Sequence, residues 1–343
     1  MIKKLVSMLS AVALTVSLVG CGSSSTTSAT SSGNTASGSG NPIVLKLGHG
    51  AATDNPRHLA AEKFAELVKE KTHGKVEVQV FPNEVLGSEP QMVDAVKLGT
   101  LDMALADTGI FASMSPKMAA INLPYLFKDY NSAYKVLDGP LGKDMAAPLE
   151  QNNIHLLAYW ENGFREITNS KHPIHTPADL SGLKMRVPEI PVSVATFKAL
   201  GTNPTPMAYG QLYTALQSKV VDGQENPLTN IYASKFYEVQ KYLTMSNHQY
   251  SALPLVINKK KWDSFSPDIQ KAIQDAANEA RDYHRQLVQQ QAKDLVSKLK
   301  AKGMVINTPD QAPFREATKD VYKQFADKIG SGFLKKLFAQ AGQ

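Results

Sequence analysis

The sequence has little of what catalytic sites are built from. Cys21 is the only cysteine among 343 residues, so no CxxC pair exists. The chain also has no GxSxG elbow, no HExxH helix, no GxGxxG turn and no GxxxxGK[ST] loop. These motifs mark hydrolases, zinc proteases, dinucleotide-binding proteins and P-loop proteins. An enzyme therefore has no support in the sequence, and no cofactor is predicted.

The histidines lack the spacing of a metal site. His172 and His175 lie close together, but they flank Pro173 in a loop-like segment, which is typical of surface histidines. The others are spread singly along the chain, at His49, His58, His73, His155, His248 and His284. We therefore predict no metal site.

Strong charge of either sign is absent. Lys and Arg number 37 against 31 Asp and Glu, a formal net charge of +6. The lysine run at 258–262 is typical of a solvated surface, and no zinc-finger, RNP or arginine-rich motif accompanies it, so no nucleic-acid partner is predicted. A composition of 43% hydrophobic and 20% charged residues fits an ordinary soluble protein with apolar material for two cores.

Long apolar runs are absent except at the start of the chain. Lys3 and Lys4 precede an uncharged run at 5–19 that is too short to span a bilayer, so residues 1–20 are predicted to be a signal peptide. The run ends in LVGC, which resembles the lipobox of bacterial lipoproteins. Cys21 is therefore predicted to be lipidated and to become the first mature residue.

The segment that follows is expected to be a flexible tether. Residues 22–40 carry neither a charge nor a large apolar side chain, so they cannot bury enough surface to offset their chain entropy. We assign residues 21–42 to the lipidated cysteine and this tether. The remaining body is predicted to be exported, and held in the periplasm or at the outer face of the cytoplasmic membrane by its lipid.

The first part of the body alternates strands and helices. Strand patterns at 43–48, 75–81 and 101–107 enclose helix patterns at 56–74 and 89–100. The first helix places its apolar side chains on one face, at Leu59, Phe64, Leu67 and Val68. This order of elements predicts an α/β fold with a largely parallel sheet.

The alternation of strands and helices returns after Trp160, a residue that we assign to the core. Strands are expected at 183–188 and 204–207, helices at 192–200 and 210–220, and a turn at 221–227. Two α/β units predict two lobes, and ligands of open α/β sheets lie where loops leave the carboxyl ends of strands. The cleft between the lobes is therefore the candidate site.

A long helical pattern follows the second unit. It begins with Ser266 and Pro267 and continues to Gly303, about 36 residues or 54 Å at the helical rise per residue. One interpretation is a single helix that crosses both lobes as a spine. The other is two shorter helices broken near 284–291, and periodicity alone does not separate them.

Four stretches of the body resemble one family. They are FPNEVLGSEPQMVDAVKLGTLDMALAD, YWENGFREITNSKHPIHTPADLSGLKMRVPE, LGTNPTPMAYGQLYTALQSKVVDGQENP and SKFYEVQKYL. In order and spacing they are similar to the solute-binding proteins of tripartite ATP-independent periplasmic (TRAP) transporters, the DctP family. The resemblance covers nearly everything from Ile43 onward.

The resemblance implies the architecture and the role. It implies a two-lobed periplasmic-binding-protein fold, type II-like, with hinge strands and a lobe-spanning helix. Lobe I would comprise residues 43–162 and 252–291, and lobe II residues 163–251 and 292–343 with the C-terminal helices. The protein would act as a monomer, close on a small organic acid and deliver it to the small and large membrane subunits of a permease.

The resemblance also implies a carboxylate clamp. Arg186 falls where the family carries its clamping arginine, and Asn226 where an amide contacts the same group. Arg165 matches a second cation of sialic-acid-binding members, in which the spacing to the clamp is one residue shorter. By pattern alone, Arg186 would be a salt-bridged or edge residue, and the segment around Asn226 a plain connection with solvated side chains.

Five further residues occupy places where relatives touch the far end of the ligand: His49, Asn55, Glu89, Asp107 and Tyr209. Acids and amides there suit the hydroxyls of a sugar acid, such as a hexuronate, and would repel a second carboxylate. Asp107 could instead be a helix N-cap that faces away from the cleft.

Three alternatives stay open. A C4-dicarboxylate such as succinate would need a second cation, which Arg165 could supply. A receptor that presents its ligand to a sensor kinase would have the same sequence features. An enzyme would have to turn the bound acid over.

Overall fold

The computed structural model describes residues 41–342, which lie in one compact unit. The predicted signal peptide, the predicted lipidation site Cys21 and nearly all of the predicted tether lie outside the described residues. Within residues 41–342, no helix is both long enough and apolar enough to cross a membrane.

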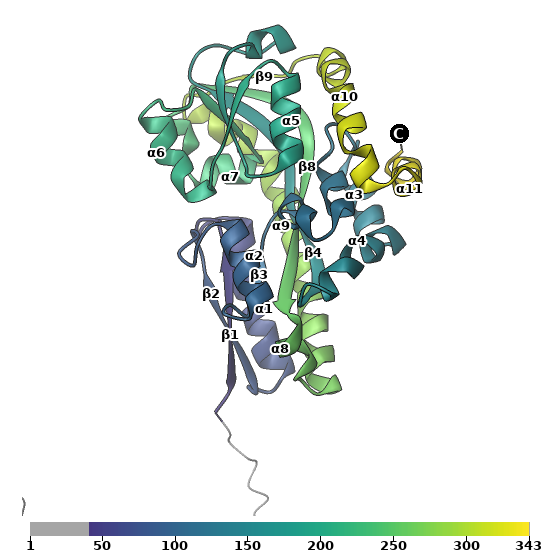
Figure 1. The fold of residues 1–343 in the computed structure, drawn as a ribbon. Helices are drawn as coiled ribbons and strands as arrows, with labels where there is room; N and C mark the ends of the chain where they lie inside the picture. The colour runs from purple at the N-terminus through teal and green to yellow at the C-terminus, as the bar shows by residue number, and fades with distance from the viewer. Residues whose placement is uncertain (1–40, 343) are drawn as a thin grey trace, which may run out of the picture. The chain divides into compact units, whose positions relative to one another are not determined.

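One sheet runs through the described chain (Figure 1). Its strand order is β2-β1-β3-β8-β4-β7-β5-β6, and β9 pairs with β8. The strands are β1 Ile43–His49, β2 Val76–Phe81, β3 Met103–Leu105, β4 Ile154–Asn169, β5 Lys184–Val187, β6 Asn203–Pro206, β7 Gly223–Asn226, β8 Tyr242–Asn258 and β9 Val305–Asn307. The predicted α/β fold with two lobes is confirmed, since each end of the sheet carries its own parallel unit.

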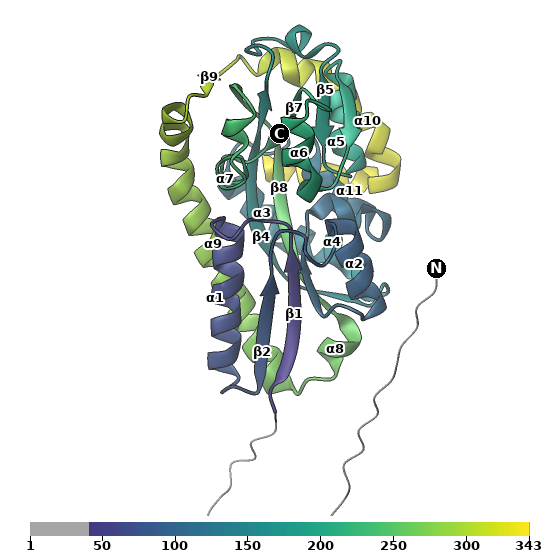
Figure 2. The same cartoon turned by 90° about the vertical axis from the view of Figure 1, so that its left-hand side faces the viewer.

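Helices pack around both ends of the sheet. The first lobe, built around β1–β3, carries α1 and α2, and the second, built around β5–β7, carries α5, α6 and α7 (Figure 2). The helices are α1 Pro56–Lys71, α2 Glu89–Leu98, α3 Tyr130–Leu137, α4 Pro140–Glu150, α5 Pro191–Ala199, α6 Leu212–Gln217, α7 Leu228–Ala233, α8 Lys259–Asp263, α9 Pro267–Ala301, α10 Ala312–Ile329 and α11 Ser331–Ala341. Short 3-10 helices include η1 Thr108–Ser113, η2 Pro116–Asn122 and η4 Tyr209–Gln211.

The long strands β4 and β8 connect the two lobes. They pair antiparallel from Ile154 opposite Asn258 to Asn169 opposite Tyr242. Their register shifts three times, between Leu156 and Ala158, Glu161 and Gly163, and Arg165 and Ile167. Such irregularities bend a strand and increase its local twist, so this pair has the form of a hinge.

The long pattern near the C-terminus forms a single helix. Helix α9 spans 35 residues, begins with Pro267 after Ser266 and carries Asp268 in its first turn. It packs on α1 and β4 of the first lobe and on α7 of the second. The spine interpretation is confirmed, and the two-helix interpretation is wrong.

The core of the first lobe forms where α1 and α9 cover the sheet. The rings of Phe64 and Trp160 meet edge to face with centroids 6.1 Å apart, and the Trp160 indole donates to the carbonyl of Ala277 at 3.2 Å. Trp160 is thus the core residue predicted. Leu59, expected on the same buried face as Phe64, is instead 38% exposed.

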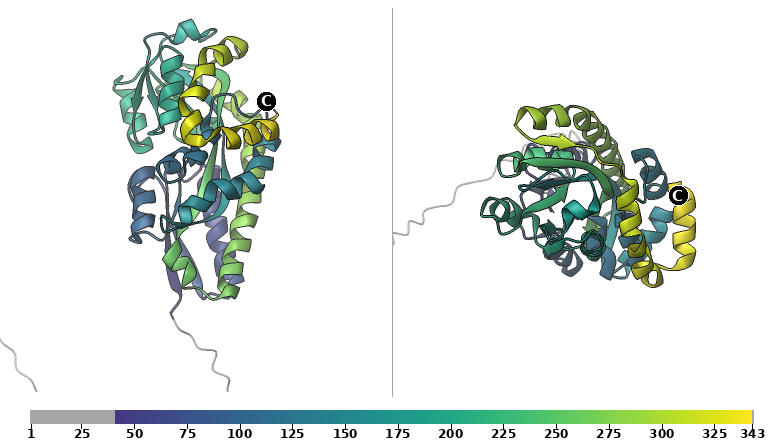
Figure 3. Two further views of the ribbon diagram at one scale, coloured as in Figure 1. Left: turned by 45° about the vertical axis from the view of Figure 1, so that its right-hand side comes forward. Right: turned by 90° about the horizontal axis from the view of Figure 1, so that it is seen from above.

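The last two helices lie along one side of the molecule (Figure 3). Helix α10 packs on α5 and η2, and α11 packs on α3. They therefore contact elements that the sequence assigns to different lobes, and the exact lobe boundaries stay a prediction.

The predicted turn at 221–227 is wrong in its central part. Residues 223–226 form the buried strand β7, which pairs with β4 and β5. Gly223 is required there because a Cβ would lie 2.4 Å from the carbonyl oxygen of Thr168. The segment looks like a turn in the sequence because its buried side chains are polar rather than apolar.

Candidate functional site

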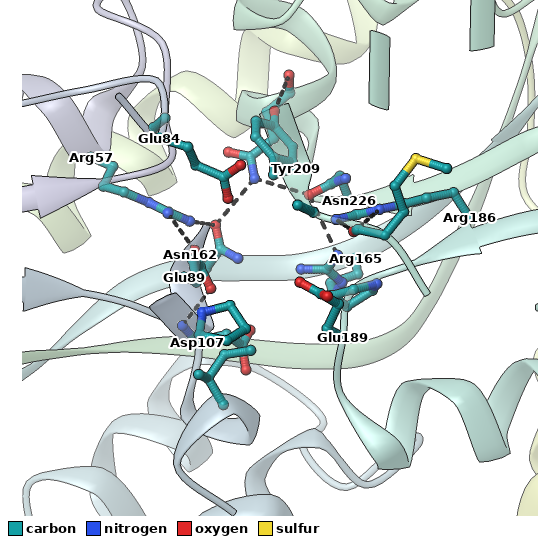
Figure 4. A pocket seen from close by; sticks show the side chains of 17 residues that line it. Arg57, Glu84, Glu89, Asp107, Asn162, Arg165, Arg186, Glu189, Tyr209 and Asn226 are labelled. Atoms are coloured by element: carbon teal, nitrogen blue, oxygen red, sulfur yellow. Dashed lines mark hydrogen bonds and ion pairs between the residues drawn. The ribbon is translucent and has the colours of Figure 1, made fainter. Parts of the chain in front are cut away.

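A polar pocket lies between the two lobes (Figure 4). The space among its lining residues, open solvent included, amounts to about 500 Å³. First-lobe elements and the hinge contribute Ala51, Arg57, Glu84, Glu89, Pro90, Asp107, Ile110, Asn162 and Arg165, and the second lobe contributes Arg186, Pro188, Glu189, Met207, Ala208, Tyr209, Asn226 and Asn230. Six of the eight predicted ligand-binding residues line it.

Arg186 is a buried cation at the second-lobe side of the pocket. Its Nε and Nη2 donate to the carbonyl of Met207 at 3.0 and 2.6 Å, and its guanidinium lies 5.9 Å from the centroid of the Tyr209 ring. Among residues 41–342 no carboxylate pairs with it. Burial lowers the pKa of Arg186 to about 10, which is the mark of a desolvated cation without an adequate counterion.

Arg165, in contrast, has a counterion of its own. Its Nε and Nη2 donate to the two carboxylate oxygens of Glu225, which lies beside it on β7, and His248 contacts the same carboxylate at 3.1 Å. Burial by itself would raise the pKa of Glu225, but Arg165 and His248 outweigh it and lower that pKa to about 2. Arg165 lines the pocket with most of its charge already neutralised.

Asn226 ends β7 between the two arginines. Its Oδ1 accepts from Asn230 at 3.0 Å and from Arg165 at 3.4 Å, and its Nδ2 donates to Gln224 at 2.6 Å. An amide nitrogen carries two hydrogens, so one remains for a ligand oxygen. This orientation agrees with the predicted role of Asn226 as a donor.

The far side of the pocket is built on an arginine that sequence reasoning missed. Arg57 Nη1 pairs with Glu89 at 3.0 Å, and its Nη2 donates to Asn162 at 3.0 Å. Its buried Nε has no partner among residues 41–342. A cation in the first turn of α1 is unfavourable for the helix dipole, and that unusual placement is the sequence feature that could have revealed it.

The sequence analysis gave Asp107 two possible roles, a ligand contact and a helix N-cap. It lines the pocket and is also the N-cap of η1. Its Oδ1 accepts from Gly109 at 3.0 Å, Asn122 at 2.9 Å and Thr108 at 3.3 Å, and its Oδ2 accepts from Ser251. Oδ1 is fully used by these bonds and Oδ2 keeps one acceptor site, so direct contact between Asp107 and a ligand hydroxyl stays a prediction.

His49 and Asn55 lie behind the pocket wall and do not line it. His49 contacts His58 at 3.2 Å and accepts from the amide of Ala51 at 3.1 Å, and burial lowers the His49 pKa well below its usual range. Asn55 caps α1 and donates to Asn230 Oδ1 at 2.9 Å. Both therefore position residues of the wall.

The aromatic side of the pocket is formed by Tyr209. Its hydroxyl contacts Ser234 at 2.6 Å, and its ring packs edge to face on Phe236 with centroids 5.9 Å apart. The ring is thereby fixed in the wall, where it can face a ligand. Two acids that the sequence analysis did not select, Glu84 and Glu189, complete the rim.

The fold and the pocket define a class, a two-lobed binding protein. Its lobes are joined by two hinge strands and a spine helix, and they meet around a polar site that holds a buried arginine without an ion pair among residues 41–342. The chain belongs to the DctP family, the bacterial extracellular solute-binding proteins of family 7, whose model matches residues 47–328. It is therefore a solute-binding protein of the TRAP type and not an enzyme, as predicted.

Comparison with individual proteins agrees with this assignment. The 2,3-diketo-L-gulonate-binding periplasmic protein YiaO of Escherichia coli K12 is 41% identical over 274 residues, which cover 80% of this chain and 84% of that protein. The galactonate complex of the sugar acid binding protein DctPAm from Advenella mimigardefordensis superposes with a TM-score of 0.85, at 36% identity over 88% and 98% of the two chains. A TRAP solute-binding protein from Sulfurospirillum deleyianum with bound succinate gives 0.82 at 35% identity, over 86% and 98%.

Proposed function

We propose that the protein captures a polyhydroxylated monocarboxylate, a sugar acid such as a hexuronate or an aldonate, in the pocket between its lobes. The observation that carries the proposal is the buried guanidinium of Arg186, which has no ion pair with any carboxylate of residues 41–342. A planar fork of donors can engage both oxygens of a carboxylate and stays charged when desolvated. A bound carboxylate would supply the counterion that this arginine lacks.

The charges of the pocket favour one carboxylate over two. Arg165 is paired with Glu225, and Arg57 with Glu89, which leaves Arg186 as the arginine of the lining without an ion pair among residues 41–342. Glu84 and Glu189 add negative charge to the rim. A second ligand carboxylate would meet these acids without a free cation, at a cost in affinity.

The polar groups of the far side suit hydroxyls. Each carboxylate oxygen of Glu89 accepts one bond, from Arg57 or from the amide of Asp107, and so keeps one acceptor site for a ligand hydroxyl. The buried Nε of Arg57 offers a donor that has no partner within residues 41–342. Hydroxyl groups both donate and accept, so a sugar acid can satisfy this mixture. The name of YiaO states that it binds 2,3-diketo-L-gulonate, which is a sugar acid, and DctPAm is described as a sugar acid binding protein.

A C4-dicarboxylate is the alternative within the family, since the Sulfurospirillum structure holds succinate. The candidate second cation for such a ligand was Arg165, and the pairing of Arg165 with Glu225 argues against that role. A receptor that presents its ligand to a sensor kinase is the other role that such a site can serve. We take transport as the function because it is the role of the family.

We infer that the protein acts as a monomer on the outer side of the cytoplasmic membrane, attached through the lipidated Cys21. It would deliver its ligand to the small and large membrane subunits of a TRAP permease. Neighbouring genes for two such subunits would support transport over signalling.

A thermal-unfolding screen tests the ligand class. Hexuronates, aldonates, sialic acid, succinate and malate are added separately to the purified protein. A ligand at 100 times its dissociation constant adds about 2.7 kcal/mol to the free energy of unfolding, which raises Tm by several degrees. We expect this shift with uronates or aldonates. A shift with succinate or malate alone would contradict the proposal.

A further inference from the structure

Two hydrogen bonds join the lobes directly across the pocket. The carboxylate of Glu84, on the loop after β2, accepts from the backbone amide of Gly210 at 2.7 Å. Asn55 at the start of α1 donates to Asn230 of α7 at 2.9 Å. The partners are 126 and 175 residues apart in the chain, and both bonds are made between protein groups alone. Closure of the two lobes therefore has polar contacts of its own.

The loop that carries Glu84 is held in an unusual conformation. Asn83 and Glu84 have φ angles of 57° and 55°, which disfavour residues with a side chain. The end of β1 fixes this conformation, because the amide of Asn83 donates to Ala51 at 3.0 Å and that of Glu84 to His49 at 3.1 Å. Strained backbone persists where its surroundings determine it, and here it directs an acidic side chain at the other lobe.

The receiving end fits a carboxylate. Gly210 lies in η4, immediately before α6, and its amide donates directly to the carboxylate. The absence of a side chain also matters, because a Cβ on Gly210 would lie 2.9 Å from the Oε2 atom of Glu84. A carboxylate accepts such a bond more strongly than a neutral group does. Burial nevertheless raises the Glu84 pKa, so the group is desolvated in the closed cleft.

We propose that Glu84 is the latch of the closed cleft, a positioning residue that holds the second lobe against the first through Gly210. This bond would help to retain the ligand of the proposed function, although the ligand takes no part in the bond. The closed state would also be populated without ligand, because the latch needs only protein groups. Ligands bind such a receptor by shifting that population.

Two substitutions break the latch from opposite sides. Glu84→Ala removes the acceptor. Gly210→Ala adds a methyl group that pushes the Glu84 carboxylate away, at the flexible end of the glutamate side chain. Glu84→Gln keeps an oxygen that can accept from Gly210. Glu77→Ala is the control, because Glu77 is an acid of the preceding strand whose ion pair, with Lys69 at 2.8 Å, stays within the first lobe.

The first readout is the radius of gyration of the ligand-free protein by small-angle X-ray scattering. We expect Glu84→Ala and Gly210→Ala to increase it, Glu84→Gln to recover most of the compaction, and Glu77→Ala to match the wild type. The second readout is the dissociation rate of the sugar acid that stabilises the wild type most. We expect about a tenfold increase for Glu84→Ala and Gly210→Ala.

The outcomes separate the latch from the proposed function. Equal radii for the wild type, Glu84→Ala and Gly210→Ala would overturn the latch, whichever ligand binds. Failure of every sugar acid to bind the wild type would overturn the proposed function, while the scattering comparison still decides the latch. If Glu84→Ala does not fold, as judged by circular dichroism, Gly210→Ala alone decides, since it leaves the loop after β2 unchanged.

Discussion

Arg186 is the residue at which burial and charge conflict most clearly. It is 3% exposed, and the carbonyl of Met207 is a neutral partner for its charge. A buried cation of this kind costs free energy until a counterion arrives, and a ligand can supply that counterion. The same residue would therefore weaken the empty protein and strengthen the complex.

We predict that Arg186→Met abolishes detectable binding of the sugar acid and leaves Tm of the empty protein unchanged or higher. Truncating one member of a buried charge pair costs about 2–5 kcal/mol of binding free energy, and methionine fills similar volume without charge. Calorimetry and thermal unfolding measure the two effects. Lys184→Met, an exposed change two residues earlier in β5, is the control. Unchanged affinity in Arg186→Met would refute the clamp.

At the scale of elements, the hinge strand β4 carries two buried acids. The Oε2 atom of Glu161 accepts from Tyr134 at 2.6 Å and from Tyr250 at 3.1 Å, while its Oε1 has no partner among residues 41–342. Glu166 accepts from the amide of Asn247 at 2.9 Å. Burial raises the pKa of Glu161 to about 7 and that of Glu166 to about 8.

These raised pKa values predict how stability depends on pH. Both folded pKa values exceed the value of 4.5 for free glutamate, so the contribution of the two acids is fully present below about pH 4.5 and is lost as pH rises through 7 and 8. Each acid can contribute at most about 1.4 kcal/mol per pH unit in that window. The free energy of unfolding should therefore fall from pH 5 to pH 9 through these groups.

Glutamine substitutions test this dependence. Urea unfolding at pH 5, 7 and 9 should show a smaller loss of stability in Glu161→Gln and Glu166→Gln than in the wild type, because the amide has no proton to lose. Glu66→Gln, whose side chain is 71% exposed, should follow the wild type. Identical pH dependence in all four proteins would show that the hinge acids do not titrate in this range.

At the scale of the whole molecule, α9 is the element that belongs to both lobes. It packs on α1, β4 and α7, so its continuity couples the lobes mechanically. A break in its middle should therefore affect stability and closure together. The sequence did not establish this continuity, because glutamine-rich helical turns fit one helix or two.

We predict that Gln290→Pro lowers the free energy of unfolding by about 3 kcal/mol relative to Gln290→Ala. Proline removes a backbone hydrogen bond inside a helix and clashes with the preceding turn. Gln290 is exposed, so the loss of the side chain itself should cost little. Urea unfolding of both variants gives the difference. Equal stability would mean that the helix is already interrupted at this point.

The class of fold and most of the pocket were predictable from sequence. Arg186, Asn226, Arg165, Glu89 and Tyr209 line the pocket, and the resemblance to the family, not periodicity, is what pointed to them. Strand β7 was missed because hydrophobic periodicity cannot detect a buried strand whose side chains are all polar. The structure shows how their polarity is satisfied, for example by the bond from Gln224 to Thr168 at 2.9 Å.

The sequence by itself determined the alternation of elements and the two lobes, since these follow from patterns a few residues long, and the resemblance to the family pointed to Arg186 as the cation of the cleft. Only the tertiary structure decided which charges are already neutralised. Arg165 and Glu225 are 60 residues apart, and Glu84 and Gly210 are 126 apart. The free energy of a charge depends on the groups within a few ångströms, and folding alone brings those groups together.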